Sequence, residues 1–151
     1  MGTLLSTALQ HRTRHVASDD GRHRLLAAVW LLACQPENAA RLAMKGGLQV
    51  LVGVLNFPCD SCYVQLKTMA VGALCQLCST DPDVATLAMH LSLASALLRA
   101  VSSDISTVYL KVLSAGLVFI LCRNPEHSTH KEDYLRQFAA DGRVELSVQH
   151  L

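Results

Sequence analysis

Three stretches of the chain carry apolar residues at matching positions, and each of them runs into a proline. They read "RHRLLAAVWLLACQPEN" (22–38), "LKTMAVGALCQLCSTDPD" (66–83) and "LKVLSAGLVFILCRNPE" (110–126). Leu, Ala and Val dominate the apolar positions while aromatic residues are scarce, which favours helices packed on helices. Each proline stops one helix and can open the next one.

The three stretches align without a gap on three cysteines that lie 44 residues apart. Self-similarity at a fixed period is the signature of a repeat architecture. The aligned cysteines are Cys34, Cys78 and Cys122. Apolar columns of the alignment are Leu25, Met69 and Leu113; Val29, Ala73 and Leu117; and Ala33, Leu77 and Leu121. A column of small residues holds Ala28, Gly72 and Gly116.

The segments between these stretches repeat less strictly. "LQVLVGVLN" (48–56) matches "ASALLRAVS" (94–102) and, more weakly, the stretch 4–10. A short helix, "PENAARLAM", is expected before the first of these, and Gly46-Gly47 would end it because glycine permits a sharp turn. One unit is therefore a short, a medium and a long helix, and its 43 to 46 residues fall in the armadillo and HEAT range.

Residues 36–80, "PENAARLAMKGGLQVLVGVLNFPCDSCYVQLKTMAVGALCQLCST", resemble one armadillo repeat. The resemblance rests on the "PEN" start, the Gly-Gly bend and the "LVGVLN" and "AVGALCQLC" helices, and it extends over nearly the whole chain. The next repeat has "MHLSLA" in place of the bend, and HEAT repeats share much of the pattern. The resemblance implies an all-α fold, a right-handed α-solenoid of three-helix repeats. Its units would be a partial repeat at 1–34, repeats at 35–80 and 81–122, and a partial repeat at 123–151.

Both ends of the chain fall inside a repeat, so we expect a piece of a longer array whose uncapped ends self-associate. A compact protein with degenerate end repeats is the alternative. The apolar side chains expected to lack a covering helix are Leu4, Leu5 and Leu9 at the front and Val144, Leu146 and Val148 at the back.

In armadillo proteins the third helices line a concave surface that binds peptides or helices, so the resemblance implies a partner-binding face on the three long helices. Its residues here would be Arg24, Ala28, Leu32, Thr68, Gly72, Gln76, Val112, Gly116 and Ile120. Importin-type members hold their ligand with a Trp and an Asn four residues later, but here only Gln76 keeps an amide. An apolar helix or a packed protein surface is therefore the expected partner, rather than a basic peptide. The alternative is that this face is buried in a longer array.

The cysteines do not predict a metal centre. Cys78 lies in a buried column, and Cys75 aligns with the apolar residues Leu31 and Phe119. Cys59 and Cys62 lie in a loop on the order of 20 Å from them along the long helix, too far for one zinc ion. We expect the aligned cysteines to be buried and Cys59 or Cys62 to be alkylated readily. The two loop cysteines are either an inert exposed pair or a redox-sensitive pair. The pairs His11 with His15 and His127 with His130 have no third ligand.

Charge and targeting signals narrow the functional classes. The net charge of the 151 residues is +1, which favours neither nucleic acid nor an anionic membrane. With no secretory signal or bilayer-length apolar run, a cytoplasmic or nuclear location is expected. "MGTLLS" fits the N-myristoylation pattern at Gly2 and Ser6, which keeps a membrane-associated adaptor as an alternative.

The expected function is a non-catalytic protein-interaction or scaffold segment with no cofactor. No phosphate-binding glycine loop, nucleophile elbow or poised carboxylate pair occurs in the sequence. A purely structural role, extending or capping a larger solenoid, is the other alternative.

Overall fold

The computed structural model describes residues 19–58 and 61–123 of the 151-residue chain. These two ranges contain seven helices and no strand. The helices are α2 (Asp19–Ala33), α3 (Pro36–Met44), α4 (Gly47–Leu55), α5 (Ser61–Thr80), α6 (Pro82–His90), α7 (Leu93–Val101) and α8 (Val108–Cys122). The all-α expectation is confirmed for this part of the chain.

The helices follow the repeating order that the sequence predicts. Two helices of nine residues precede the 20-residue α5, and two more of nine residues precede the 15-residue α8. The first two helices of each unit are therefore equal in length, rather than short and medium. Pro36 and Pro82 occupy the first turns of α3 and α6, where the missing N–H group of proline costs no helix hydrogen bond.

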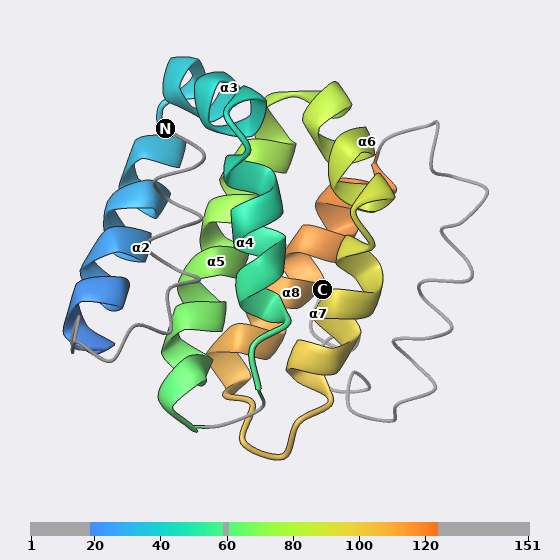
Figure 1. Cartoon of the computed structure of the whole chain (residues 1–151). Coiled ribbons are helices and arrows are strands. Elements are labelled where there is room, and N and C mark those ends of the chain that lie inside the picture. Colours follow the sequence, from blue (N-terminus) through green and yellow to red (C-terminus); the bar gives the residue numbers. More distant parts are fainter. Residues whose placement is uncertain (1–18, 59–60, 124–151) are drawn as a thin grey trace.

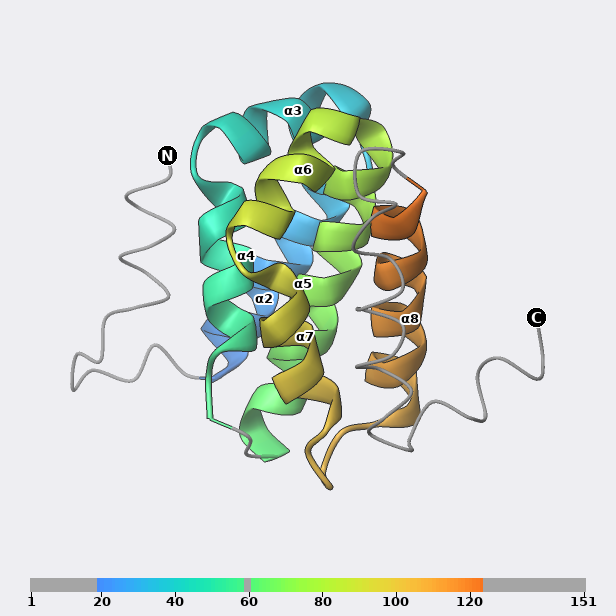
Figure 2. The same ribbon diagram turned by 90° about the vertical axis from the view of Figure 1, so that its right-hand side faces the viewer.

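The long helices form one layer and the second helices of each unit form another (Figure 1). In the first layer α2 contacts α5 and α5 contacts α8, so α5 lies between the other two. In the second layer α4 packs against α7, and each also contacts the long helix of its own unit. Helices α3 and α6 cross one end of both layers (Figure 2). Because α5 also contacts α3 and α6, it is the central helix of the described part.

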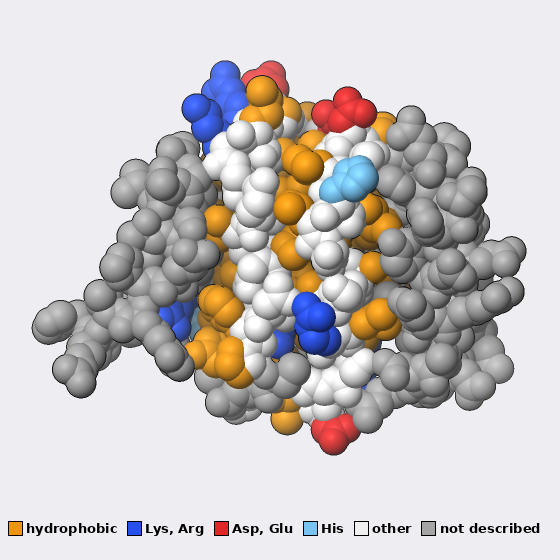
Figure 3. All heavy atoms as spheres, turned by 45° about the vertical axis from the view of Figure 1, so that its right-hand side comes forward, with side chains coloured by type: hydrophobic (Ala, Val, Ile, Leu, Met, Phe, Trp, Pro, Cys, Tyr) orange, Lys and Arg blue, Asp and Glu red, His pale blue; other side chains and the backbone are white. Residues whose placement is uncertain are grey.

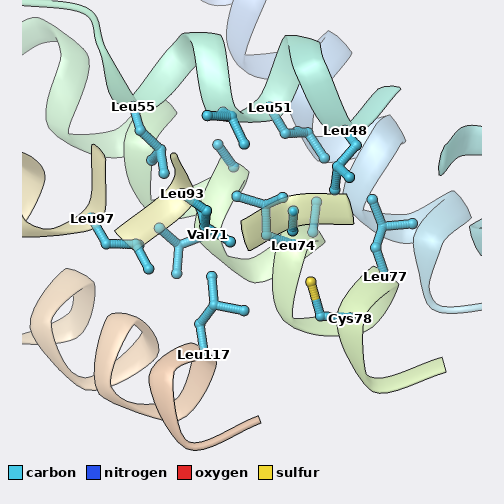
Figure 4. Close-up of a cluster of buried hydrophobic side chains, with 14 of the residues drawn as sticks. Leu48, Leu51, Leu55, Val71, Leu74, Leu77, Cys78, Leu93, Leu97 and Leu117 are labelled. Carbon is cyan, nitrogen blue, oxygen red and sulfur yellow. The ribbon is translucent and has the colours of Figure 1, made fainter. Parts of the chain in front are cut away.

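Side chains from both layers meet between them (Figure 4). Helix α4 contributes a buried leucine face and α7 contributes another, and these lie against residues of α5 and α8. Two of the aligned apolar columns are buried in all three long helices, as predicted. They are Val29, Ala73 and Leu117, and Ala33, Leu77 and Leu121. Side chains labelled in the close-up are Leu48, Leu51, Leu55, Val71, Leu74, Leu77, Cys78, Leu93, Leu97 and Leu117. Burial of such side chains, each contributing about 1.5–3 kcal/mol, is the main force that holds the helices together.

The bends between first and second helices differ in the residue that makes them. Gly46 has a φ of 82°, and Ser92 at the same place in the next unit has a φ of 59°. Both angles are left-handed, where glycine is not penalised and serine is. A Cβ atom on Gly47 would lie 2.6 Å from the backbone oxygen of Leu42, so this close approach also requires glycine.

Two helices begin with a side-chain cap. The Asp81 carboxylate accepts a hydrogen bond of 2.9 Å from the N–H of Asp83 at the start of α6. The Thr107 hydroxyl accepts one of 3.2 Å from the N–H of Leu110 at the start of α8. Each satisfies a backbone donor that has no partner within its own helix.

Among the described residues, no single helix is long and apolar enough to cross a membrane. Helices α6 and α7 reach that length and apolar character only when taken together, and they are bent by 74° relative to each other.

Candidate interaction surface

The predicted partner-binding residues lie on α2, α5 and α8, but they do not form one open face. Six of them are exposed. These are Arg24, Ala28 and Leu32 on α2, Gln76 on α5, and Val112 and Gly116 on α8. Ile120 is half-buried. Thr68 and Gly72 of α5 are buried. The middle of the predicted surface is therefore covered, whereas its two sides are open.

The indole of Trp30 covers the centre of α5. A Cβ atom added to Gly72 would lie 2.5 Å from two ring carbons of Trp30, so the indole of α2 rests directly on the glycine. The expectation that Gly72 faces an open groove is thus wrong. Sequence reasoning missed this contact, although one signal was present. Trp30 is 44 residues before Leu74, which is fully buried, so its alignment indicated an inward position.

Thr68 is engaged within its own helix. Its hydroxyl donates a 2.8 Å hydrogen bond to the backbone oxygen of Val64, one turn earlier. The side chain is buried, so it offers no group to a ligand. Of the three α5 residues predicted to bind a partner, only Gln76 presents its side chain to solvent.

Helix α8 carries a continuous exposed apolar face. Val108 is 77% exposed and Phe119 is 65% exposed, while Tyr109 and Val112 are each 56% exposed. These positions repeat at intervals of three and four, so they form one face of a helix over about three turns. Gly116 lies within this face, and a Cβ atom there would meet nothing within 4 Å. We call Val108, Tyr109, Val112, Gly116 and Phe119 the outer face of α8.

The aligned residues Leu31, Cys75 and Phe119 do not all face the interior of the protein. Leu31 is 72% exposed, like Phe119, and only Cys75 is largely covered. The reason is the position of α5 between two long helices. The Cys75 thiol donates to the backbone oxygen of Leu113 on α8 across 3.6 Å, so α8 covers this side of α5. The described residues place no corresponding long helix over Phe119.

The two thiols near the C-terminal end of α5, those of Cys75 and Cys78, are in a poorly reactive state. Burial raises the pKa of the Cys75 thiol from 9.0 to about 12, and a hydrogen bond from its own backbone, which lowers the pKa, offsets only part of this rise. Burial also raises the pKa of the Cys78 thiol to about 12, and the neighbouring charge of an ionised Cys75 adds to the shift. Only the thiolate is a good nucleophile or metal ligand, so neither cysteine is suited to either role near neutral pH.

The aligned cysteines differ in exposure, contrary to the expectation that all three are buried. Cys78 is buried and Cys122 is half-buried, but Cys34 is exposed. Cys34 lies just beyond the end of α2, which is at the edge of the layer of long helices. It therefore lacks the second neighbouring long helix that helps to cover Cys78.

Several predicted features lie outside the described residues. They are the possible acylation site at Gly2, both histidine pairs, Cys59, and the end segments expected to self-associate. The side chain of Cys62 is likewise not described. Within residues 19–58 and 61–123, no group of three His, Cys, Asp or Glu side chains is placed to hold a metal ion.

Comparisons of the chain with protein-family models, with curated proteins and with solved structures gave no significant match.

Proposed function

We propose that this chain is a segment of an armadillo-type α-solenoid that binds a partner protein without catalysing a reaction. The outer face of α8 is the observation that carries the proposal. The largest apolar patch on a soluble protein is often functional, and a contiguous apolar surface of this kind commonly marks a protein-interaction site. The repeated order of two short helices and one long helix supports the solenoid.

The chemistry of the exposed sides favours an apolar partner. Leu31 and Leu32 are exposed on α2, and the outer face of α8 bears no charged residue. A basic peptide would find no carboxylate on these faces, whereas the apolar stripe of an amphipathic helix would bury against them. The proposed location is the cytoplasm or nucleus. Acylation at Gly2 remains the membrane-associated alternative, which an intact-mass measurement on material from eukaryotic cells would decide.

Affinity capture with the full chain tests the binding proposal. Val112→Asp or Leu32→Asp places a carboxylate on an exposed apolar face and should reduce the amount of a captured protein at least about tenfold. Met44→Asp is the matched control, because Met44 is 86% exposed but lies on α3. Equal capture by all four proteins would contradict binding through the faces of α2 and α8.

A structural role in a larger array is the second candidate. The Trp30–Gly72 contact favours it, because the indole closes the middle of the surface on which a ligand would lie. If this role is correct, deleting the segment from a longer parent protein should leave partner binding intact while lowering the parent's thermal stability.

A further inference from the structure

The outer face of α8 is complementary to itself. It has bulky residues towards both ends and the glycine Gly116 one turn beyond Val112. We propose that two copies of this chain associate through this face, with their α8 helices antiparallel and related by a twofold axis. This inference goes beyond the proposed function, since it concerns the purified chain alone.

An antiparallel pairing centred between Val112 and Gly116 places each valine over the glycine of the other copy. Gly116 has open space above it, so the valine can approach the helix backbone closely. Trp30 on Gly72 is an example of this packing within the chain, where a large apolar group of one helix rests on a glycine of the next. The same pairing brings Tyr109 of one copy to Phe119 of the other, and aromatic pairs of this kind add about 0.5–1.5 kcal/mol beyond area burial.

Charge distinguishes the antiparallel arrangement from a parallel one. Arg123 follows the C-terminal end of α8 and is exposed. A parallel twofold pairing would place Arg123 beside its own copy and Gly116 against Gly116, giving repulsion and an unfilled gap. In the antiparallel arrangement each Arg123 lies beyond the N-terminal end of the other copy's α8, so the two arginines are at opposite ends of the pair. No like charges then face each other across the pair.

The size of the face sets the expected strength. An exposed patch of a few large side chains amounts to roughly a few hundred Å². Stable interfaces bury about 800 Å² on each partner, so the association should be weak and reversible. A partner protein that uses Val112 and Gly116 would compete with it, so self-association would limit access to that partner.

Sedimentation velocity of the full chain over a wide concentration range tests whether the face associates. We expect a reversible monomer–dimer equilibrium that Val112→Asp weakens roughly 100-fold, because each copy would bury an unpaired carboxylate. Met44→Asp should leave the equilibrium unchanged, and circular dichroism should show that both variants remain helical. A monomer at every concentration, or equal dimerisation by wild type and Val112→Asp, would overturn the proposal.

Mixing two disrupted variants tests the antiparallel arrangement itself. Val112→Asp and Gly116→Lys should each fail to self-associate, yet a mixture of the two should form a heterodimer because the aspartate faces the lysine. Val112→Asp mixed with Val112→Lys should not form one, since those positions do not face each other. Recovery only in this second mixture would show a parallel pair and refute the stated geometry. A dimer that Val112→Asp disrupts, together with partner capture that the same variant leaves unchanged, would instead count against the proposed function alone.

Discussion

Gly72 and Gly116 occupy the same position of successive long helices, yet their surroundings are opposite. The indole of Trp30 rests on Gly72, whereas the space above Gly116 is open. Gly116→Ala should stabilise the chain by about 0.5–1 kcal/mol, because alanine is the better helix former. Gly72→Ala gains the same propensity but forces the indole away at a cost of about 1–3 kcal/mol, so the net effect should be a loss.

Urea unfolding of both variants and of the wild type measures this difference. Two alanine substitutions with equal effects on the free energy of unfolding would show that Trp30 does not rest on Gly72 in solution. The comparison needs no further control, because the two substitutions are chemically identical and lie in the interiors of helices α5 and α8.

Ser114 is a buried polar residue without a satisfied hydroxyl. Its side chain is fully buried in α8, and its oxygen has no hydrogen-bond partner. An unpaired buried hydroxyl costs about 1–3 kcal/mol, so Ser114→Ala should raise the free energy of unfolding by about 1 kcal/mol or more. Ser79→Ala is the control, because Ser79 is an exposed serine within a helix. That substitution should raise the free energy of unfolding by only the roughly 0.5 kcal/mol that comes from helix propensity. A Ser114→Ala gain no larger than that of Ser79→Ala would mean that the hydroxyl finds a partner.

At the scale of the helical elements, the turn before the second helix differs between the two units. Ser92 holds a left-handed backbone conformation for which Gly46 is the better residue in the first unit. Ser92→Gly should therefore stabilise the chain by about 0.5–1 kcal/mol. This net gain is the left-handed strain that is relieved minus the extra backbone entropy that glycine loses on folding. Gly46→Ser should destabilise it by a similar amount. Thermal melts of the two variants check both directions, and a lower melting temperature for Ser92→Gly would contradict the assigned strain.

The fold of the whole molecule also links stability to pH through two thiols. Cys75 and Cys78 titrate near 9.0 in the unfolded chain, whereas burial raises the pKa of each to about 12 in the folded one. Their contribution to stability is complete below pH 9, and it is lost as pH rises from there towards 12, because the unfolded state releases these protons first. The free energy of unfolding should therefore fall between about pH 8.5 and about pH 10.5.

Replacing both thiols isolates this effect from the titration of tyrosine and lysine. A Cys75→Ala, Cys78→Ala double variant should show a shallower fall than the wild type in urea titrations over the same pH range. Identical slopes for the two proteins would mean that the thiols are solvated in the folded state.

Sequence reasoning predicted helix order and the core more accurately than it predicted surfaces. Proline and glycine act on the backbone locally, so Pro36, Pro82 and Gly46 correctly marked where helices begin or bend. The period of 44 residues also identified buried columns such as that of Val29. Both signals depend on residues near one another in the chain or on positions that face the core of every unit.

Exposure of a column was harder to predict because it depends on which helix lies beside each unit. The same column is exposed at Leu31 and Phe119 but largely covered at Cys75, since only α5 has a long helix on both sides. The Trp30–Gly72 contact likewise joins residues from different columns of the alignment. A repeat predicts equivalent positions, but it does not specify the neighbours at the two edges of a layer.

The contact between Trp30 and Gly72 has an optical consequence. Trp30 is the single tryptophan of the chain, and it is half-buried where α2 meets α5. Its emission therefore reports the docking of that one helix pair, while circular dichroism reports helix content throughout. If α2 separates before the rest of the chain unfolds, the red shift of the fluorescence should occur at a lower urea concentration than the loss of ellipticity. Coincident transitions would instead show that α2 unfolds together with the helices behind it.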